Sequence, residues 1–225
     1  MLNHTTPLIL DKKAFKNPIP EVSGLAPKDN MKAWVDRKSH IHNFGHSAAA
    51  YSGFITDPEV IYLADILRIK SVRDFTKSAM LQSAGVLVKK YPEEFTMDDL
   101  TEHINDLLHR FENRALGDTV FRVGCDLKRK LHRNDRILSP LIDGIKLGSK
   151  VDYILQTFKC SLSFGAKDEN GKMFPGDIEF VEMLRVKGLS YTLLNICGLI
   201  PETDYKVIDL ILSAVSDAPS AKSIL

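Results

Sequence analysis

One stretch of the sequence, DRKSHIHNFGH at residues 36–46, combines side chains that could do chemistry. It holds a lysine, an asparagine and three of the seven histidines. On one α-helix, with about 100° between successive residues, four of these side chains share a side. They are Lys38, His42, Asn43 and His46. The same geometry points His40 away from them, so the helix that carries this stretch determines what its side chains can do.

Three interpretations of the stretch compete. His42 and His46 have the i, i+4 spacing of zinc ligands, but no acid or cysteine supplies a third ligand nearby, and Lys38 would put a cation beside the metal. Alternatively, a lysine desolvated near a second cation such as Arg37 can act as a general base, with Asn and His side chains holding a substrate oxygen. In the third interpretation these residues form only a solvated, charged helix face.

A second basic segment, KRKLHRNDR at residues 128–136, places five cations within nine positions. The whole chain has 30 Lys and Arg against 29 Asp and Glu, so no overall charge attracts nucleic acid or an anionic membrane. A local concentration of cations suits a phosphate, and we expect Lys130 and Arg133 to contact a phosphate or hydroxyl groups. A solvated basic turn between helices is the alternative.

The cysteines and the N-terminus bear on the compartment. Three widely spaced cysteines with no CxxC pair indicate neither a disulfide framework nor a cysteine zinc site. The apolar run near the N-terminus is too short for a signal peptide or a membrane span. We therefore expect a soluble, cytoplasmic protein.

The pattern of the chain predicts an all-α, multi-helix bundle preceded by an extended arm. Residues 1–27 are proline-containing and aperiodic, with a short strand expected at PLILD, and residues 28–225 form the helical domain. The first helix should start near Asp29 and run for about six turns, and others should cover about 70–90 and 97–111. Asp57 followed by Pro58 predicts a further helix start. FGAKDENGKMFPGD predicts a long turn, and no GxGxxG, GxxxxGK[ST] or βαβ pattern occurs.

The spacing of Lys38, Asn43 and His46, K-x4-N-x2-H, resembles that of the polyol-specific long-chain dehydrogenases. The surrounding DNMKAWVDRKSHIHNFGHSAAAYSGF resembles that family's active-site helix. The later segment RFENRALGDTVFRVGCDLKRKLHRNDRILSPL, residues 110–141, resembles a second family segment, and its RKLHRNDR is similar to the mannitol-1-phosphate 5-dehydrogenase branch. The implied fold is that of the C-terminal domain of mannitol and 6-phosphogluconate dehydrogenases.

The resemblance implies a metal-independent, NAD-dependent oxidation of a secondary alcohol. Lys38 would be the general base, Asn43 would stabilise the charged oxygen, and His46 would hydrogen-bond the substrate. Arg122 and Lys130 match the pair that grips substrate hydroxyls. In the family an N-terminal Rossmann domain, which this chain lacks, binds NAD. We therefore expect the isolated chain to be inactive and to expose an apolar docking face through which it forms homo-oligomers.

The sequence alone is compatible with several substrates and functions. Mannitol 1-phosphate is the leading substrate because of the basic RKLHRNDR segment. A free hexitol or a hexuronate is the alternative, since a carboxylate would use the same cations. A helical interaction module that has lost the chemistry is a further candidate, and so is a histidine-based metal protein. Whether the candidate residues converge on one cleft discriminates among them.

Overall fold

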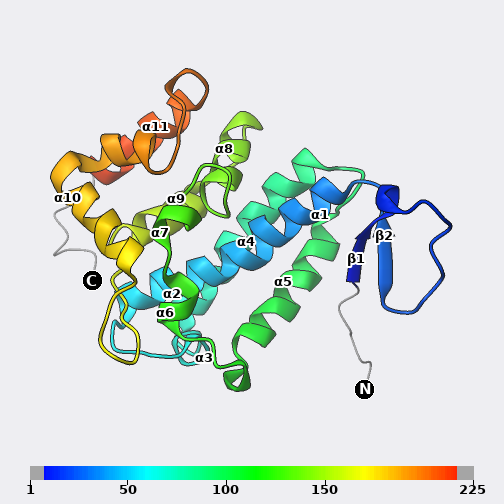
Figure 1. Ribbon diagram of the computed structural model, residues 1–225, viewed down its shortest axis with the longest axis horizontal. Helices are drawn as coiled ribbons and strands as arrows, with labels where there is room; N and C mark the ends of the chain where they lie inside the picture. The colour runs from blue at the N-terminus through cyan, green and yellow to red at the C-terminus, as the bar shows by residue number, and fades with distance from the viewer. Residues whose placement is uncertain (1–7, 217–225) are drawn as a thin grey trace.

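The computed structural model of the 225-residue chain describes residues 8–216, and these are mostly helical (Figure 1), which confirms the all-α prediction. The elements are β1 (Leu8–Asp11), η1 (Lys12–Ala14), β2 (Leu25–Lys28), α1 (Met31–Arg37), η2 (Lys38–Asn43), α2 (Phe44–Thr56), α3 (Leu63–Ile66), α4 (Lys70–Lys90), α5 (Met97–Phe111), η3 (Arg114–Leu116), α6 (Val120–Gly124), α7 (Leu127–Lys130), α8 (Leu138–Lys146), α9 (Asp152–Ser161), α10 (Pro175–Asn195) and α11 (Pro201–Ser216).

The described part of the arm forms a small parallel sheet beside α1. The expected strand at PLILD is β1, and it pairs with β2 from Leu8↔Leu25 to Asp11↔Lys28. The ammonium of Lys28 lies 4.0 Å from the centre of the Trp34 ring, and the Arg37 guanidinium lies 5.0 Å from the same ring. The contact from Lys28, the last residue of β2, joins the small sheet to the helix that leads into Lys38, whereas the contact from Arg37 lies within that helix.

A continuous helical rod, α1–η2–α2, runs through the middle of the molecule (Figure 1). The side chain of Asn30 caps its start by accepting a hydrogen bond from the backbone N–H of Ala33. The rod packs along α4, and α6 and α9 also contact α2. The contact with α4 is close at Gly45, where a Cβ atom would lie 2.6 Å from Met80 Sδ. A glycine is needed there because α4 occupies the space of a side chain.

Helices α4 and α5 have the bounds that the sequence predicts. Thr96 caps α5 through the backbone N–H of Asp99, and α4 ends at Lys90, just before Tyr91 and Pro92. One face of α5 is apolar and buried against the rest of the domain. Its buried residues are Leu100, Ile104, Leu107, Leu108 and Phe111.

The predicted helix start at Asp57 is wrong. Asp57 instead ends α2, and its carboxylate accepts the backbone N–H of Glu59 in a local turn. The chain then extends to pair with a distant segment, so that Val120 N donates to Ile61 O at 2.8 Å and Leu63 N donates to Asp118 O at 2.9 Å. This pairing satisfies the backbone of residues 61–63 without a helix, and α3 begins only at Leu63.

The second half of the described chain packs helices α6 to α11 against this framework. Among them α7 contacts α10, and α8 contacts α11. The long turn expected at FGAKDENGKMFPGD is present before α10, and α10 is kinked at Gly188, whose φ of 80° favours glycine. Within residues 8–216, no helix is both long and apolar enough to cross a membrane.

Candidate active site

The candidate residues lie on an interruption of the central rod. Residues Lys38–Asn43 form a π-helix, η2, between two α-helical segments, whereas the sequence predicts one regular α-helix. In a π-turn the hydrogen bonds join residues five apart, so residues i and i+5 lie above one another. Lys38 and Asn43 have this spacing. The π-turn thus brings closer together two side chains that a regular α-helix would place about 140° apart on the side that they share.

The π-turn is supported from α4. The hydroxyl of Ser83 donates a hydrogen bond of 2.7 Å to the backbone carbonyl of His40. The ring of His40 is 1% exposed, and its Nε2 lies 3.0 Å from Ser139 Oγ. The prediction that His40 points away from Lys38 agrees with this position, and the structure gives the ring a place in the core.

Two neighbouring histidines form the centre of the site. The ring centres of His42 and His46 are 5.0 Å apart, and the His46 ring stacks on Phe111 with centres 3.8 Å apart. The Nε2 atom of His46 is buried without a hydrogen-bond partner and lies 3.7 Å from a carboxylate oxygen of Asp118. Phe111 of α5 and Asp118 therefore close two sides of the His46 imidazole.

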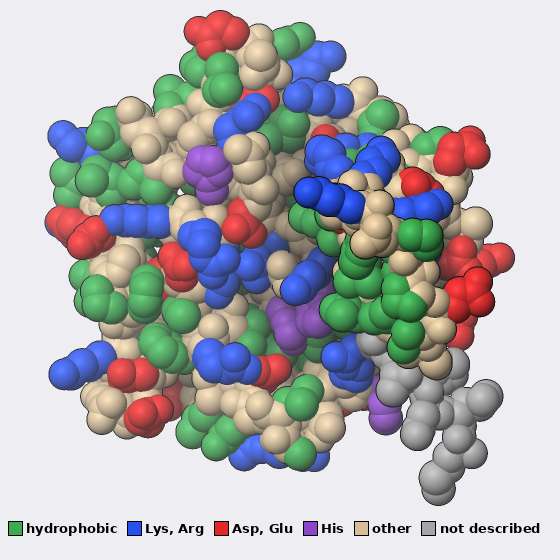
Figure 2. All heavy atoms as spheres, turned by 45° about the vertical axis from the view of Figure 1, so that its right-hand side comes forward, with side chains coloured by type: hydrophobic (Ala, Val, Ile, Leu, Met, Phe, Trp, Pro, Cys, Tyr) green, Lys and Arg blue, Asp and Glu red, His purple; other side chains and the backbone are tan. Residues whose placement is uncertain are grey.

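Both imidazoles are uncharged near neutral pH. Burial lowers the pKa of His42 to about 4 and that of His46 to about 3, and nearby cations lower both further. The cations that act on one ring or the other come from widely separated segments: Arg37, Lys38, Arg110, Arg122, Lys130 and Arg136. On the face shown in Figure 2, histidine side chains lie in a hollow among Lys and Arg side chains. Positively charged side chains are thus concentrated around the pair of His42 and His46.

Lys38 and Asn43 are both accessible from this site. Lys38 is exposed, and within residues 8–216 its side chain makes no hydrogen bond or ion pair. Its charge acts on His42, and Asn43 is half-buried on the same turn. The amine of Lys38 and the amide of Asn43 are therefore free to meet a ligand.

The predicted pair Arg122 and Lys130 lies close enough to His46 to lower its pKa. Arg122 forms an ion pair with Asp118, the residue beside His46. Lys130 is 4% exposed and donates hydrogen bonds to the backbone carbonyls of Val123, at 2.6 Å, and of Cys125. Both cations lower the pKa of His46, so both act at the same site.

Arg133 occupies a different environment. Its guanidinium binds both carboxylate oxygens of Asp204 on α11, at 2.9–3.1 Å, and Asp204 is 1% exposed. Arg136, from the same basic segment, acts on both histidines instead. Arg136 was not among the contacts predicted from the five-cation segment, which were Lys130 and Arg133, because the sequence does not show which cations lie near the histidines and which one binds α11. Asp118 was missed as well, although its spacing of four from Arg122 fits an ion pair.

Residues 8–216 hold neither a cluster of metal ligands nor a dinucleotide-binding fold. Within the described chain, no group of three or more His, Cys, Asp and Glu side chains could hold a metal ion. The sheet of residues 8–216 has two strands and no βαβ unit with a glycine-rich turn. The described residues therefore offer no fold of the kind that holds a dinucleotide.

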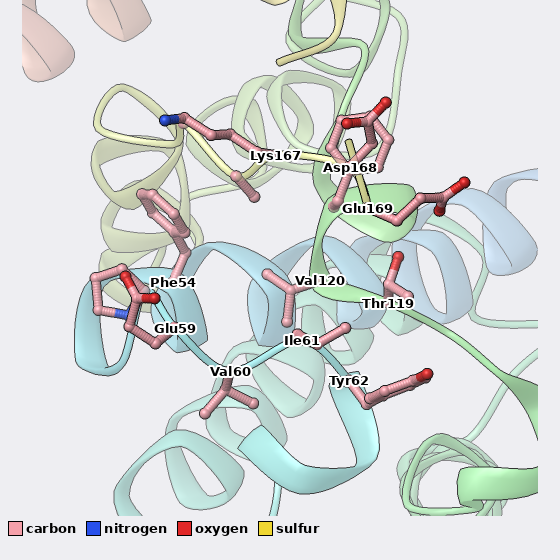
Figure 3. A pocket seen from close by; sticks show the side chains of 14 residues that line it. Phe54, Glu59, Val60, Ile61, Tyr62, Thr119, Val120, Lys167, Asp168 and Glu169 are labelled. Carbon is pink, nitrogen blue, oxygen red and sulfur yellow. The ribbon is translucent and has the colours of Figure 1, made fainter. Parts of the chain in front are cut away.

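A separate groove of about 560 Å³ lies between the segment after α2 and the loop before α10 (Figure 3). Phe54, Val60 and Ile61 line it from one side, and the loop brings Lys167 and Asp168. Its lining includes neither the histidine pair nor Lys38. It is therefore distinct from the candidate site, although Thr119 in its lining follows Asp118 directly.

The fold and the site together indicate the class of protein. It is a helical domain with a hollow in which a lysine, an asparagine and two uncharged histidines meet several cations. Over residues 30–191, more than half of the chain, the sequence matches the family model described as mannitol dehydrogenase C-terminal domain. The chain belongs to this family and is therefore a polyol dehydrogenase domain, which confirms the resemblance seen in K-x4-N-x2-H.

Proposed function

We propose that this domain takes part in the NAD-dependent oxidation of a secondary alcohol in a sugar-alcohol phosphate, with mannitol 1-phosphate as the leading substrate. The observation that carries the proposal is that Lys38 and cations from three other segments, α5, α6 and residues 128–136, act on His42 or His46, which lie on the same rod as Asn43. A helical interaction module that had lost the chemistry would have no reason to keep these groups together.

Each of the three central residues has a defined role in this proposal. Lys38 takes the proton of the reacting hydroxyl, which requires an amine that is not already bound to an acid. Asn43, one π-turn further, donates its amide N–H to the oxygen as charge develops there. His46 hydrogen-bonds a neighbouring hydroxyl of the substrate and orients it. None of these steps needs a metal.

The cations explain the choice of a phosphorylated substrate. Arg122, Lys130 and Arg136 all lower the pKa of His46. Arg122 is paired with Asp118 and Arg136 with Asp135, so a phosphate of nearly two negative charges would draw on Lys130 and compete with these two carboxylates for the arginines. Arg133 joins them only if its pair with Asp204 opens. The alternative substrate is a hexuronate, whose carboxylate would use the same cations, or a free hexitol, which would leave them unused.

NAD, when bound, accepts the hydride, and we propose that a separate Rossmann domain holds it against this site. The helical chain tested alone should therefore not turn over substrate. The apolar surface meant for that domain should favour self-association, which sedimentation would reveal. We also propose a cytoplasmic location, because the three cysteines are free, as is usual in a reducing compartment.

The decisive experiment supplies a Rossmann domain of the family, fused or as a separate chain, and follows NADH formation. With mannitol 1-phosphate as substrate, Lys38→Ala should lower kcat by about 10²- to 10⁴-fold, the range of general-base catalysis. Lys32→Ala is the matched control, since Lys32 is an exposed lysine of the same rod and pairs with Asp36. Equal activity of the two variants would show that Lys38 is not the general base.

The substrate is tested in the same assay. Mannitol 1-phosphate should be preferred over mannitol and over hexuronates, and preference for a hexuronate would select the alternative. If the domain complex forms and binds NAD but oxidises none of the three, the interaction-module interpretation replaces the enzyme.

A further inference from the structure

The imidazole of His46 is held on three sides. The face of Phe111 stacks on it with ring planes 27° apart, and the edge of His42 meets it at 62°. Its Nε2 is enclosed and faces Asp118 Oδ2 at 3.7 Å. Nδ1 is not among the enclosed atoms without a partner and makes no hydrogen bond to residues 8–216, so it is the accessible nitrogen. The ring therefore presents one nitrogen to a carboxylate and the other to the hollow.

Asp118 is itself fixed from two directions. Its backbone carbonyl accepts the N–H of Leu63, and the next residue, Thr119, pairs with Tyr62 and caps α6. Its other carboxylate oxygen binds the guanidinium of Arg122, and the side chain is only 12% exposed. The carboxylate thus touches Arg122 and approaches His46 from a position that the backbone determines.

We propose that Asp118 is a positioning residue that holds His46 in the tautomer with its proton on Nε2. A carboxylate attracts an N–H and repels a nitrogen lone pair, and no other acceptor among the described residues is within hydrogen-bond reach of Nε2. Closing 3.7 Å to hydrogen-bond distance needs a movement of less than about 1 Å. The tautomer then leaves the lone pair of Nδ1 facing the hollow.

This assignment determines what His46 can do for a ligand, and it rests on the proposed function only in the identity of that ligand. With a lone pair on Nδ1, His46 accepts a hydrogen bond from a substrate hydroxyl. A carbonyl oxygen offers no such hydrogen, so His46 favours a hydroxyl at the position that it contacts. The donor to the developing oxyanion must then be another group, as proposed for Asn43.

The test uses the full chain labelled with ¹⁵N and two-bond ¹H–¹⁵N spectra of the histidine rings near pH 7, with the His46 signals assigned through His46→Gln. The Nε2–H pattern is expected for His46. Asp118→Asn should shift the ratio of the two tautomers by about tenfold toward Nδ1–H, because an amide can donate to Nε2. Asp118→Glu, which keeps a carboxylate, should show the same Nε2–H pattern as the unaltered chain.

Asp65→Asn is the matched control. It makes the same carboxylate-to-amide change and also weakens an ion pair with an arginine, Arg114, but Asp65 does not contact His46. An Nδ1–H pattern in the unaltered chain overturns the proposal, and so does an unchanged His46 pattern in a folded Asp118→Asn variant. Adding mannitol 1-phosphate tests the proposed function separately: if His46 is Nε2–H but no His46 signal responds to ligand, the positioning role stands and the substrate is wrong.

Discussion

At the scale of single residues, burial decides what each cation of the site can do. Lys130 is almost fully enclosed, and this burial, reinforced by the charges of Arg136 and Arg129, lowers its pKa to about 8. Below that pH its ammonium is charged and can contribute to binding an anion. Above it the amine is neutral, although it still occupies the same place.

This pKa makes ligand affinity depend on pH. A phosphomonoester keeps its charge between about pH 7 and 9, because its second pKa is about 6. Mannitol 1-phosphate should therefore bind the chain about tenfold more weakly at pH 9 than at pH 7, as Lys130 loses its proton. Calorimetric titration at the two pH values measures the difference.

Mannitol without the phosphate is the control ligand, and its affinity should change little over the same range. In Lys130→Met, which keeps most of the stem, the phosphate ester should bind with a nearly flat pH profile. Parallel profiles for the two ligands in the unaltered chain would contradict the role of Lys130.

At the scale of elements, the π-turn η2 determines which side chains of the site lie close together. It places Lys38 and Asn43 on one face, and it depends on a contact between two helices, the hydrogen bond from Ser83 on α4 to His40 O. Helices α1 and α2 can continue on either side because the residues that flank η2, Arg37 and Phe44, keep helical backbone angles.

Ser83→Ala should destabilise this arrangement. The carbonyl of His40 would lose its side-chain donor in a buried place, which costs about 1–3 kcal/mol of unfolding free energy. Urea unfolding followed by circular dichroism measures this loss. Ser78→Ala on the same helix is the control, since Ser78 makes no side-chain hydrogen bond within the described chain, and it should change stability by less than about 0.5 kcal/mol. Equal effects of both changes would show that the π-turn does not need Ser83.

At the scale of the whole molecule, buried histidines make stability depend on pH. Burial lowers the pKa of His40, His42 and His103 to about 4 and that of His46 to about 3, from an ordinary value of 6.5. At pH values between about 4 and 6.5, these histidines bind more protons in the unfolded chain than in the folded chain. The stability that the neutral rings contribute is thus complete above pH 6.5 and is lost as the pH falls toward 4.

Urea unfolding from pH 8 to pH 5 should show this loss. The free energy of unfolding should be nearly constant above pH 7 and fall increasingly below pH 6.5. His40→Gln removes one of the four groups, so its curve should fall less steeply, by up to about 1.4 kcal/mol per pH unit. A free energy of unfolding that rose on acidification would show that these histidines are charged in the folded chain.

The sequence by itself determined the all-helical class, helices α4 and α5, and the motif Lys38, Asn43 and His46. These depend on short-range physics: apolar periodicity, the cap at Thr96, and the spacing of a few residues. Tertiary structure alone decided the π-turn, the late start of α3, the binding of Arg133 to Asp204, and the position of Asp118 beside His46. Each of these depends on a contact between segments far apart in the chain, and such contacts can outweigh local preferences because they satisfy buried polar groups that the local sequence leaves open.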